Sequence, residues 1–122
     1  MNLGAVRLFV HEIEPARRFY ESVLGLALHY DGSAHGVCVF RSGSIELLLE
    51  SVGRDAPAEE RCLVGRFSGL SFDVADIRAE RERLGALGVV FSGEPALQPW
   101  GGWLATLRDP AGNALQLVQR PG

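Results

Sequence analysis

The sequence predicts an α+β fold made of two tandem βαβββ modules, and three observations support this prediction. Alternating apolar and polar residues, typical of strands, are interrupted once in each half by a helical pattern that ends at a glycine. The halves also match one another, since Val10 corresponds to Val74 and Gly25 to Gly88 at offsets of 64 and 63 residues. The final strands match at an offset of 70 residues. One module alone would leave a side of its sheet bare, so we expect a curved mixed sheet around a central cleft, with the helices on the outside.

The first module is expected to span residues 1–52. Alternation over 5–10 predicts a strand that ends near His11. Pro15 suits the start of a helix, and apolar residues follow it at helical spacing until Gly25. Three further strands are expected at 26–30, 37–40 and 45–49, with the turn between the last two at 42–43.

The second module is expected at 67–122, after a linker over 53–66 that is rich in glycine, proline and charge. A strand over 69–74 leads to a helix that Asp76 can cap and Gly88 can end. A short strand at 89–91 and a loop at 93–101 precede a hairpin, whose turn is Asp109-Pro110-Ala111-Gly112-Asn113. Together the modules form a single domain over 1–122.

Composition favours a cytoplasmic protein. The chain has 122 residues and a net charge of -3, which lacks the basic excess of a nucleic-acid surface. No apolar run approaches the roughly 20 residues that cross a bilayer, and the N-terminus does not resemble a signal peptide. Cys38 and Cys62 lack metal-type spacing and are expected to be free thiols. We therefore expect no nucleic-acid or membrane partner.

Strand alternation predicts which side chains face the cleft. If Leu8 and Val10 pack under the first helix, then Ala5, Arg7 and Phe9 face the other way. The same rule assigns to the cleft Glu46, Leu48, Glu50, Gly69, Ser71, Asp73, Leu104, Thr106, Gln116 and Val118. For Arg7 two interpretations stay open, an ion pair with Glu46 or Asp73 and a contact to an anionic ligand.

Three stretches carry a family resemblance: Ala16–Tyr20 through Val23–Leu26, Phe72–Asp76, and Asp109–Asn113. With the FY-x-x-VLGL and DPxGN patterns, the chain resembles the vicinal oxygen chelate superfamily, which includes glyoxalase I, extradiol dioxygenases and bleomycin resistance proteins. The resemblance runs essentially end to end. It implies paired βαβββ modules and a ligand site between the halves or across a homodimer, with the modules paired within one chain or swapped between chains.

The resemblance also implies four positions at which the metal enzymes of the superfamily carry ligands. They fall on Ala5, Glu46, Gly69 and Gln116, and two of these have no side chain that binds metal. We therefore expect no metal site and no cofactor. The predicted function is metal-independent binding of a planar or aromatic small molecule, such as an antibiotic that is sequestered. The alternative is a lyase, isomerase or dioxygenase with an atypical divalent-metal site, or with Glu46 as the catalytic general base.

Aromatic rings suit a site for a planar ligand. The predicted ligand-binding residues are Arg7, Phe9, Glu46, Trp100, Trp103, Thr106 and Gln116. Trp100 lies in a loop flanked by proline and glycine, which favours a ligand contact. Alternation puts Trp103 on the same strand face as Ala105 and Leu107, so a place in the core is equally possible for it. Which of the two tryptophans lines the cleft therefore stays open.

Overall fold

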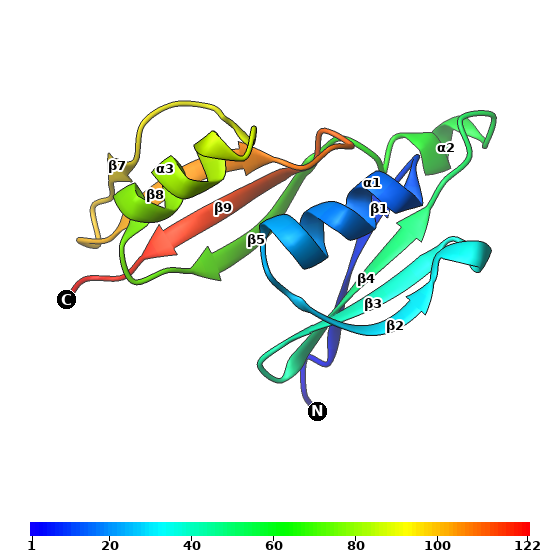
Figure 1. Ribbon diagram of the computed structural model, residues 1–122, viewed down its shortest axis with the longest axis horizontal. Helices are drawn as coiled ribbons and strands as arrows, with labels where there is room; N and C mark the ends of the chain where they lie inside the picture. Colours follow the sequence, from blue (N-terminus) through cyan, green and yellow to red (C-terminus); the bar gives the residue numbers. More distant parts are fainter. The chain divides into compact units, whose positions relative to one another are not determined.

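Each half of the chain builds its own sheet, with a helix between its first two strands. The computed structural model describes residues 1–122 as two units, Met1–Arg66 (unit 1) and Phe67–Gly122 (unit 2). The α+β class is confirmed, and both units follow the predicted order of strand, helix and further strands (Figure 1).

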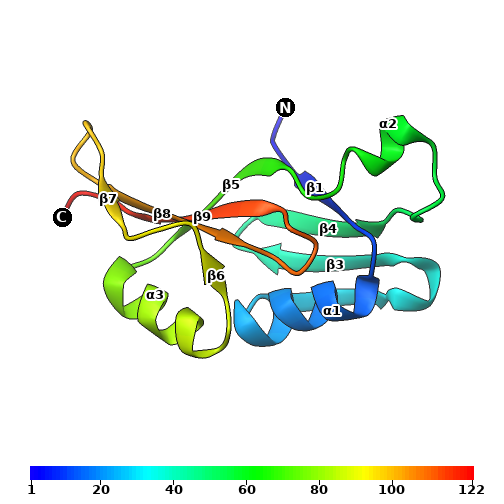
Figure 2. The same cartoon turned by 90° about the horizontal axis from the view of Figure 1, so that it is seen from above.

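Unit 1 holds a four-stranded mixed sheet in the order β1-β4-β3-β2. The elements run over β1 Ala5–Val10, α1 Ile13–Arg18, the π-helical turn η1 Phe19–Val23, β2 Ala27–Gly32, the 3-10 turn η2 Ser33–His35, β3 Val37–Ser42 and β4 Ile45–Ser51. β1 pairs with β4 in parallel, and the other pairs are antiparallel. Helix α1 lies along one face of this sheet (Figure 2). The buried core beneath it includes Leu8, Val10, Tyr20, Cys38, Phe40, Leu47 and Leu49.

Helix α1 begins two residues before Pro15. Pro15 therefore lies in the first turn, where a missing N–H is tolerated. It ends in a wider turn, because the N–H of Leu24 donates to the carbonyl of Phe19 at 2.9 Å. Gly25 then takes the left-handed conformation at φ 76°, as expected for the residue after a helix.

A polar network joins α1 to β2. Arg17 donates to Glu14 and Glu21 at 3.0 and 3.1 Å, and lies 4.0 Å from Asp31. The hydroxyl and backbone N–H of Ser33 both donate to Asp31, which lowers the pKa of that carboxyl.

Unit 2 holds a five-stranded sheet in the order β5-β9-β8-β6, with β7 also on β8. The elements run over β5 Phe67–Asp73, α3 Ile77–Ala86, β6 Val90–Phe91, β7 Ala96–Leu97, β8 Trp103–Arg108 and β9 Ala114–Gln119. The predicted caps of its helix are confirmed. The Asp76 side chain accepts from the N–H of Ala79 at 3.1 Å, and Gly88 follows the helix at φ 90°.

Two segments hold more structure than the sequence predicts. The linker over 53–66 contains helix α2, Ala58–Arg61, and Val64 forms a parallel bridge with Phe9. Within the expected loop at 93–101, β7 pairs with β8 around a turn in which Gly101 donates to Gln98 at 2.9 Å. None of the helices is long and apolar enough to span a membrane.

The Asp109–Asn113 turn is an internally bonded unit. The Asp109 carboxylate is 5% exposed and accepts from the N–H groups of Ala111 and Asn113, both at 2.9 Å. The side-chain amide of Asn113, which is fully buried, donates to the same carboxylate at 3.0 Å. The turn therefore holds β8 against β9 through side chains as well as backbone.

Candidate functional site

The sheet of unit 1 has a helix-free face, by which we mean the face opposite α1. Leu47 and Leu49 of β4 are 4% and 0% exposed on the α1 side, so Glu46, Leu48 and Glu50 project from the helix-free face. Strand register arranges this face in three rows, Ala5–Glu46–Arg41–Ala27, Arg7–Leu48–Val39–Tyr30 and Phe9–Glu50–Val37–Gly32.

Arg7 forms an ion pair on this face, with Glu50 instead of the predicted Glu46 or Asp73. Its Nε donates to Glu50 Oε2 and its Nη2 to Oε1 at 3.0 Å, so both carboxylate oxygens are used. These bonds raise the pKa of Arg7. The guanidinium also lies over the Phe9 ring, 5.2 Å from its centroid. Two predicted ligand-binding residues, Arg7 and Phe9, thus lie together.

Glu46 lies in the neighbouring row and faces a different cation. Its Oε2 is 3.6 Å from Arg41 Nε, and its cross-strand neighbour on β1 is Ala5. The side chain is 37% exposed. Any reaction in which Glu46 acts as a general base would therefore take place beside the guanidinium of Arg41.

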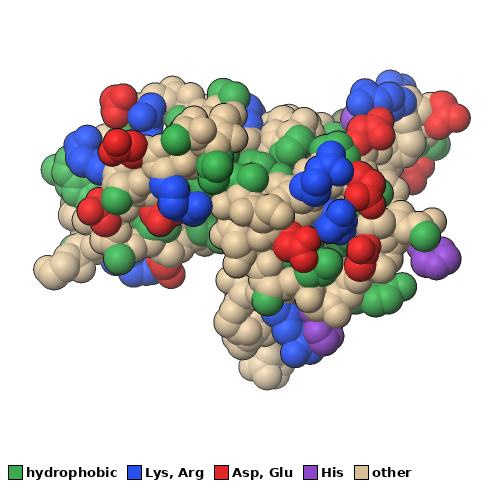
Figure 3. All heavy atoms as spheres, in the orientation of Figure 1, with side chains coloured by type: hydrophobic (Ala, Val, Ile, Leu, Met, Phe, Trp, Pro, Cys, Tyr) green, Lys and Arg blue, Asp and Glu red, His purple; other side chains and the backbone are tan.

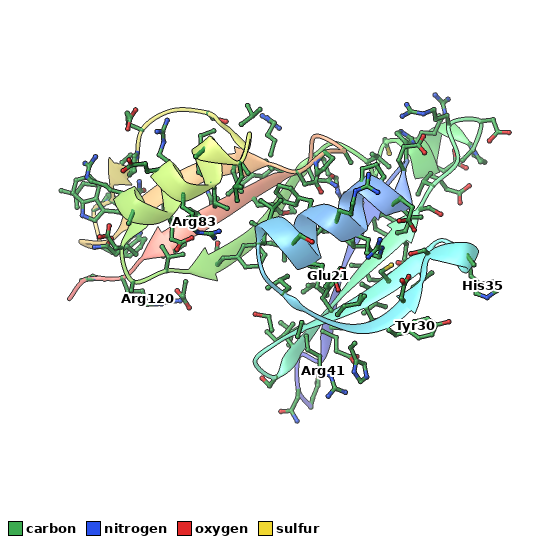
Figure 4. All side chains as sticks on the ribbon, viewed as in Figure 1. Glu21, Tyr30, His35, Arg41, Arg83 and Arg120 are labelled. Carbon is green, nitrogen blue, oxygen red and sulfur yellow. The ribbon has the colours of Figure 1, made fainter.

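Apolar side chains separate the two ion pairs. Leu48 and Val39 are adjacent in the middle row, and both are partly buried. At the margin of the row, Tyr30 is 52% exposed (Figure 4). The helix-free face of unit 1 therefore presents an apolar strip bordered by two charged pairs.

The helix-free face of unit 2 carries a row of polar side chains. Thr106, Gln116 and Ser71 form one row across β8, β9 and β5. The pairing of β5 with β9 shifts between Phe67 and Ser71, where Gly69 has φ 75°. Gln116 therefore lies opposite Ser71 and not opposite Gly69. In the next row, Asp73 binds Arg120 at 2.8 Å.

The two tryptophans have different surroundings. Trp103 shares the parity of Ala105 and Leu107, which are 3% and 0% exposed, and Arg78 of α3 lies over its ring at 5.3 Å. The structure therefore places Trp103 on the helix side, away from Thr106 and Gln116. Trp100 is 51% exposed in the turn between β7 and β8, and its ring fills the space into which a Gly102 side chain would project.

The four positions implied for metal ligands do not form a donor set. Ala5 and Gly69 offer no side-chain donor, and Glu46 lies beside the guanidinium of Arg41. Gln116 supplies one amide oxygen, and its cross-strand neighbours are Ser71 and Thr106. No group of three or more His, Cys, Asp or Glu side chains in the structure is arranged to hold a metal ion. The residues present do not fit the metal of the superfamily's enzymes.

Sequence reasoning missed Arg41 as a site residue, although a local signal was available. Gly43 has φ 60° at the first position of a two-residue hairpin turn, a geometry that glycine favours. Such a turn pairs Ser42 with Ile45 and therefore Arg41 with Glu46. Counting outward from the turn would have placed this cation beside Glu46.

Comparison with known proteins identifies one family and many similar structures. The family model described as the Glyoxalase/Bleomycin resistance protein/Dioxygenase superfamily matches residues 2–117. A search of curated proteins gave no match.

Among solved structures, UcmS2 is 28% identical with a TM-score of 0.81, covering 97% of each chain. TnmS3, an antibiotic binding protein from Streptomyces sp. CB03234, is 27% identical with a TM-score of 0.77, covering 98% of this chain and 96% of its own. A lactoylglutathione lyase from Agrobacterium tumefaciens shares the fold. It is 22% identical with a TM-score of 0.77, covering 97% of this chain and 92% of its own.

Proposed function

Because the chain belongs to the Glyoxalase/Bleomycin resistance protein/Dioxygenase superfamily, we propose that it binds a planar or aromatic small molecule without the help of a metal. One observation carries the proposal. Of the four superfamily metal positions, Ala5 and Gly69 have no donor, and the Glu46 carboxylate has the Arg41 guanidinium 3.6 Å away. Metal-dependent chemistry needs about three protein ligands with an open position, a number this set does not reach.

The surface chemistry supports the same proposal. The apolar strip of Leu48 and Val39 offers an apolar surface for a ring, and Phe9 lies in the row beyond it. Ion pairs on both sides of the strip would orient polar substituents. The similarity to TnmS3, which is described as an antibiotic binding protein, supports the binding of a small molecule.

Besides Leu48 and Val39 of the apolar strip, the residues proposed to contact the ligand are Arg7, Phe9, Glu46, Trp100, Thr106 and Gln116. We do not retain Trp103, because it lies under Arg78 on the helix side. A homodimer and a cytoplasmic location also remain part of the proposal. Light scattering coupled to gel filtration would test the first, since a monomeric mass would contradict it.

The test is a thermal-shift and calorimetric screen of planar polycyclic aromatic compounds, run before and after treatment with EDTA. We expect a hit whose affinity does not change when metal is removed. A stoichiometric divalent metal that survives dialysis would contradict the proposal. Turnover stimulated by added Ni²⁺, Mn²⁺ or Fe²⁺, and abolished by Glu46→Gln, would favour the enzymatic alternative instead.

A matched pair of variants locates the site. Val39→Thr keeps the β-branched shape but places a hydroxyl on the apolar strip, so affinity for a hit should fall severalfold. Val90→Thr makes the same change on β6, where the side chain is 65% exposed, and should leave affinity unchanged. Equal affinities in both variants would place the ligand elsewhere.

A further inference from the structure

A small pocket lies at one end of the helix-free face of unit 1, where the β3–β4 hairpin meets the start of β1. Its volume is about 330 Å³, and its lining residues are Gly4, Arg41, Gly43, Ser44 and Glu46. The N–H of Glu46 donates to the carbonyl of Gly4 at 3.0 Å, which fixes the N-terminal segment beside the hairpin. In Figure 4, Arg41 is labelled at this end of unit 1.

Small residues keep the pocket open. In the row that contains the Arg41 and Glu46 pair, both outer positions are alanines, Ala27 and Ala5. A methyl group added at Gly4 or at Gly43 would meet no atom within 4 Å. Open space therefore adjoins the charged pair on the side of the glycines.

The Arg41 guanidinium has donors to spare. Its Nη2 contacts His29 Nε2 at 3.2 Å, and the 3.6 Å separation of its Nε from Glu46 is too long for a hydrogen bond. Figure 3 shows basic and histidine side chains together at this end of unit 1. Since a guanidinium carries five N–H groups, most remain for a planar acceptor such as a carboxylate. Glu46, with the hydroxyl of Ser44, can accept from a neighbouring donor on the ligand.

Strand geometry connects this pocket to the apolar strip. Neighbouring rows of the sheet are about 7 Å apart, because a strand rises about 3.3 Å per residue. A ring that lies on Leu48 and Val39 would therefore bring an attached carboxylate within reach of Arg41.

We propose that the ligand is an aromatic carboxylic acid with a hydrogen-bond donor next to the carboxylate, that Arg41 binds the carboxylate and that Glu46 accepts from the donor. The inference rests on the proposed function and specifies the class of its ligand. Charge-assisted bonds from a guanidinium are among the stronger hydrogen bonds in proteins, so the carboxylate should dominate recognition.

The experiment uses three related probes with the intact chain: 3-amino-2-naphthoate, its uncharged methyl ester, and 2-naphthoate, which lacks the amino group. The amino group has two N–H donors, so one remains for Glu46 when the other bonds to the neighbouring carboxylate. Calorimetry measures affinity, and ¹H–¹⁵N spectra report on the amides of Gly43 and Ser44 and on Arg41 Nε. We expect 3-amino-2-naphthoate to bind at least tenfold more tightly than its ester and severalfold more tightly than 2-naphthoate, with shifts at these groups.

Variants separate this inference from the proposed function. Arg41→Gln should reduce affinity for the acid about tenfold without affecting the ester, and Arg41→Lys, which keeps charge without the planar fork, should fall between. Arg54→Gln is the control. It removes another exposed ion pair of unit 1, in which Arg54 Nε lies 3.5 Å from Glu12 Oε1, and should leave the affinity for both the acid and the ester unchanged. If acid and ester bind equally, or if Arg41→Gln binds the acid normally, the inference is wrong while aromatic binding stands. If no probe binds, this ligand class is wrong, and a hit of another class in the broader screen would still uphold the proposed function.

Discussion

Replacement of Asp109 by alanine should destabilise unit 2 severely, although the residue lies in a turn. The buried carboxylate accepts from the backbone N–H of Asn113 at 2.9 Å and from its side-chain amide at 3.0 Å. Because Asn113 is fully buried, water cannot readily replace the lost acceptor for either donor. Each buried donor that loses its partner costs about 1 to 3 kcal/mol, so Asp109→Ala should lower the free energy of unfolding by about 2 to 6 kcal/mol. This is a large fraction of the 5 to 15 kcal/mol typical of small domains.

Urea denaturation monitored by tryptophan fluorescence measures this loss, because both tryptophans lie in unit 2. Asp109→Asn keeps one oxygen for the backbone donors but turns an amide toward the Asn113 amide, so its loss should be smaller, about 1 to 3 kcal/mol. Asp55→Ala, at an exposed position in unit 1, is the control and should change stability by about 0.5 kcal/mol or less. If Asp109→Ala unfolds at the same urea concentration as the control, the turn does not hold β8 to β9 in the way described.

Three further outcomes are expected. Gly102→Ala would place its methyl carbon 1.8 Å from the Trp100 ring, so the ring should move outward. We expect a red-shifted tryptophan emission and a loss of about 1 to 3 kcal/mol in stability. Unchanged emission would contradict this packing. One thiol should react rapidly with a maleimide in the native protein, and two should react after denaturation. Cys62 is exposed, whereas Cys38 is fully buried and burial raises the pKa of its thiol. Labelling of Cys38 in the native protein would be inconsistent with this core. Because folding lowers the pKa of Asp31, the stability that its carboxylate contributes is present above its unfolded pKa, near 3.8, and is lost as pH falls through the lower folded value; acid titrations of Asp31→Asn should show a weaker pH dependence below pH 4 than the parent.

Local rules explain which parts of the fold could be predicted from the sequence. Gly25 and Gly88 end their helices because a left-handed residue is needed there, and Asp76 caps α3 with its own side chain. Each of these signals lies within a few residues of the structure that it determines. Strand alternation similarly assigned side chains to the two faces of each sheet wherever the pairing was regular.

The partners within the candidate site depend on long-range geometry. Alternation placed Arg7 on the correct face, but several carboxylates shared that face, and only the register and the reach of the guanidinium select Glu50. Similarly, Ser71 comes to lie opposite Gln116 because the pairing shifts near Gly69. A glycine permits such a shift but does not show that one occurs, so the partner of Gln116 could not be predicted from the sequence alone.

The parallel pairing of the first and last strand in each unit also has a kinetic consequence. About 40 or more residues separate β1 from its partner β4, and β5 from its partner β9, as Ala5 and Glu46 illustrate. Closing a loop of this length costs conformational entropy before the strands make their stabilising contacts. This cost slows folding. During synthesis, unit 1 cannot complete its sheet until β4 has left the ribosome, and until then the edge of β3 that β4 will cover lies bare. Nascent chains that stop before Ile45 should therefore engage chaperones more than chains that extend past Ser51.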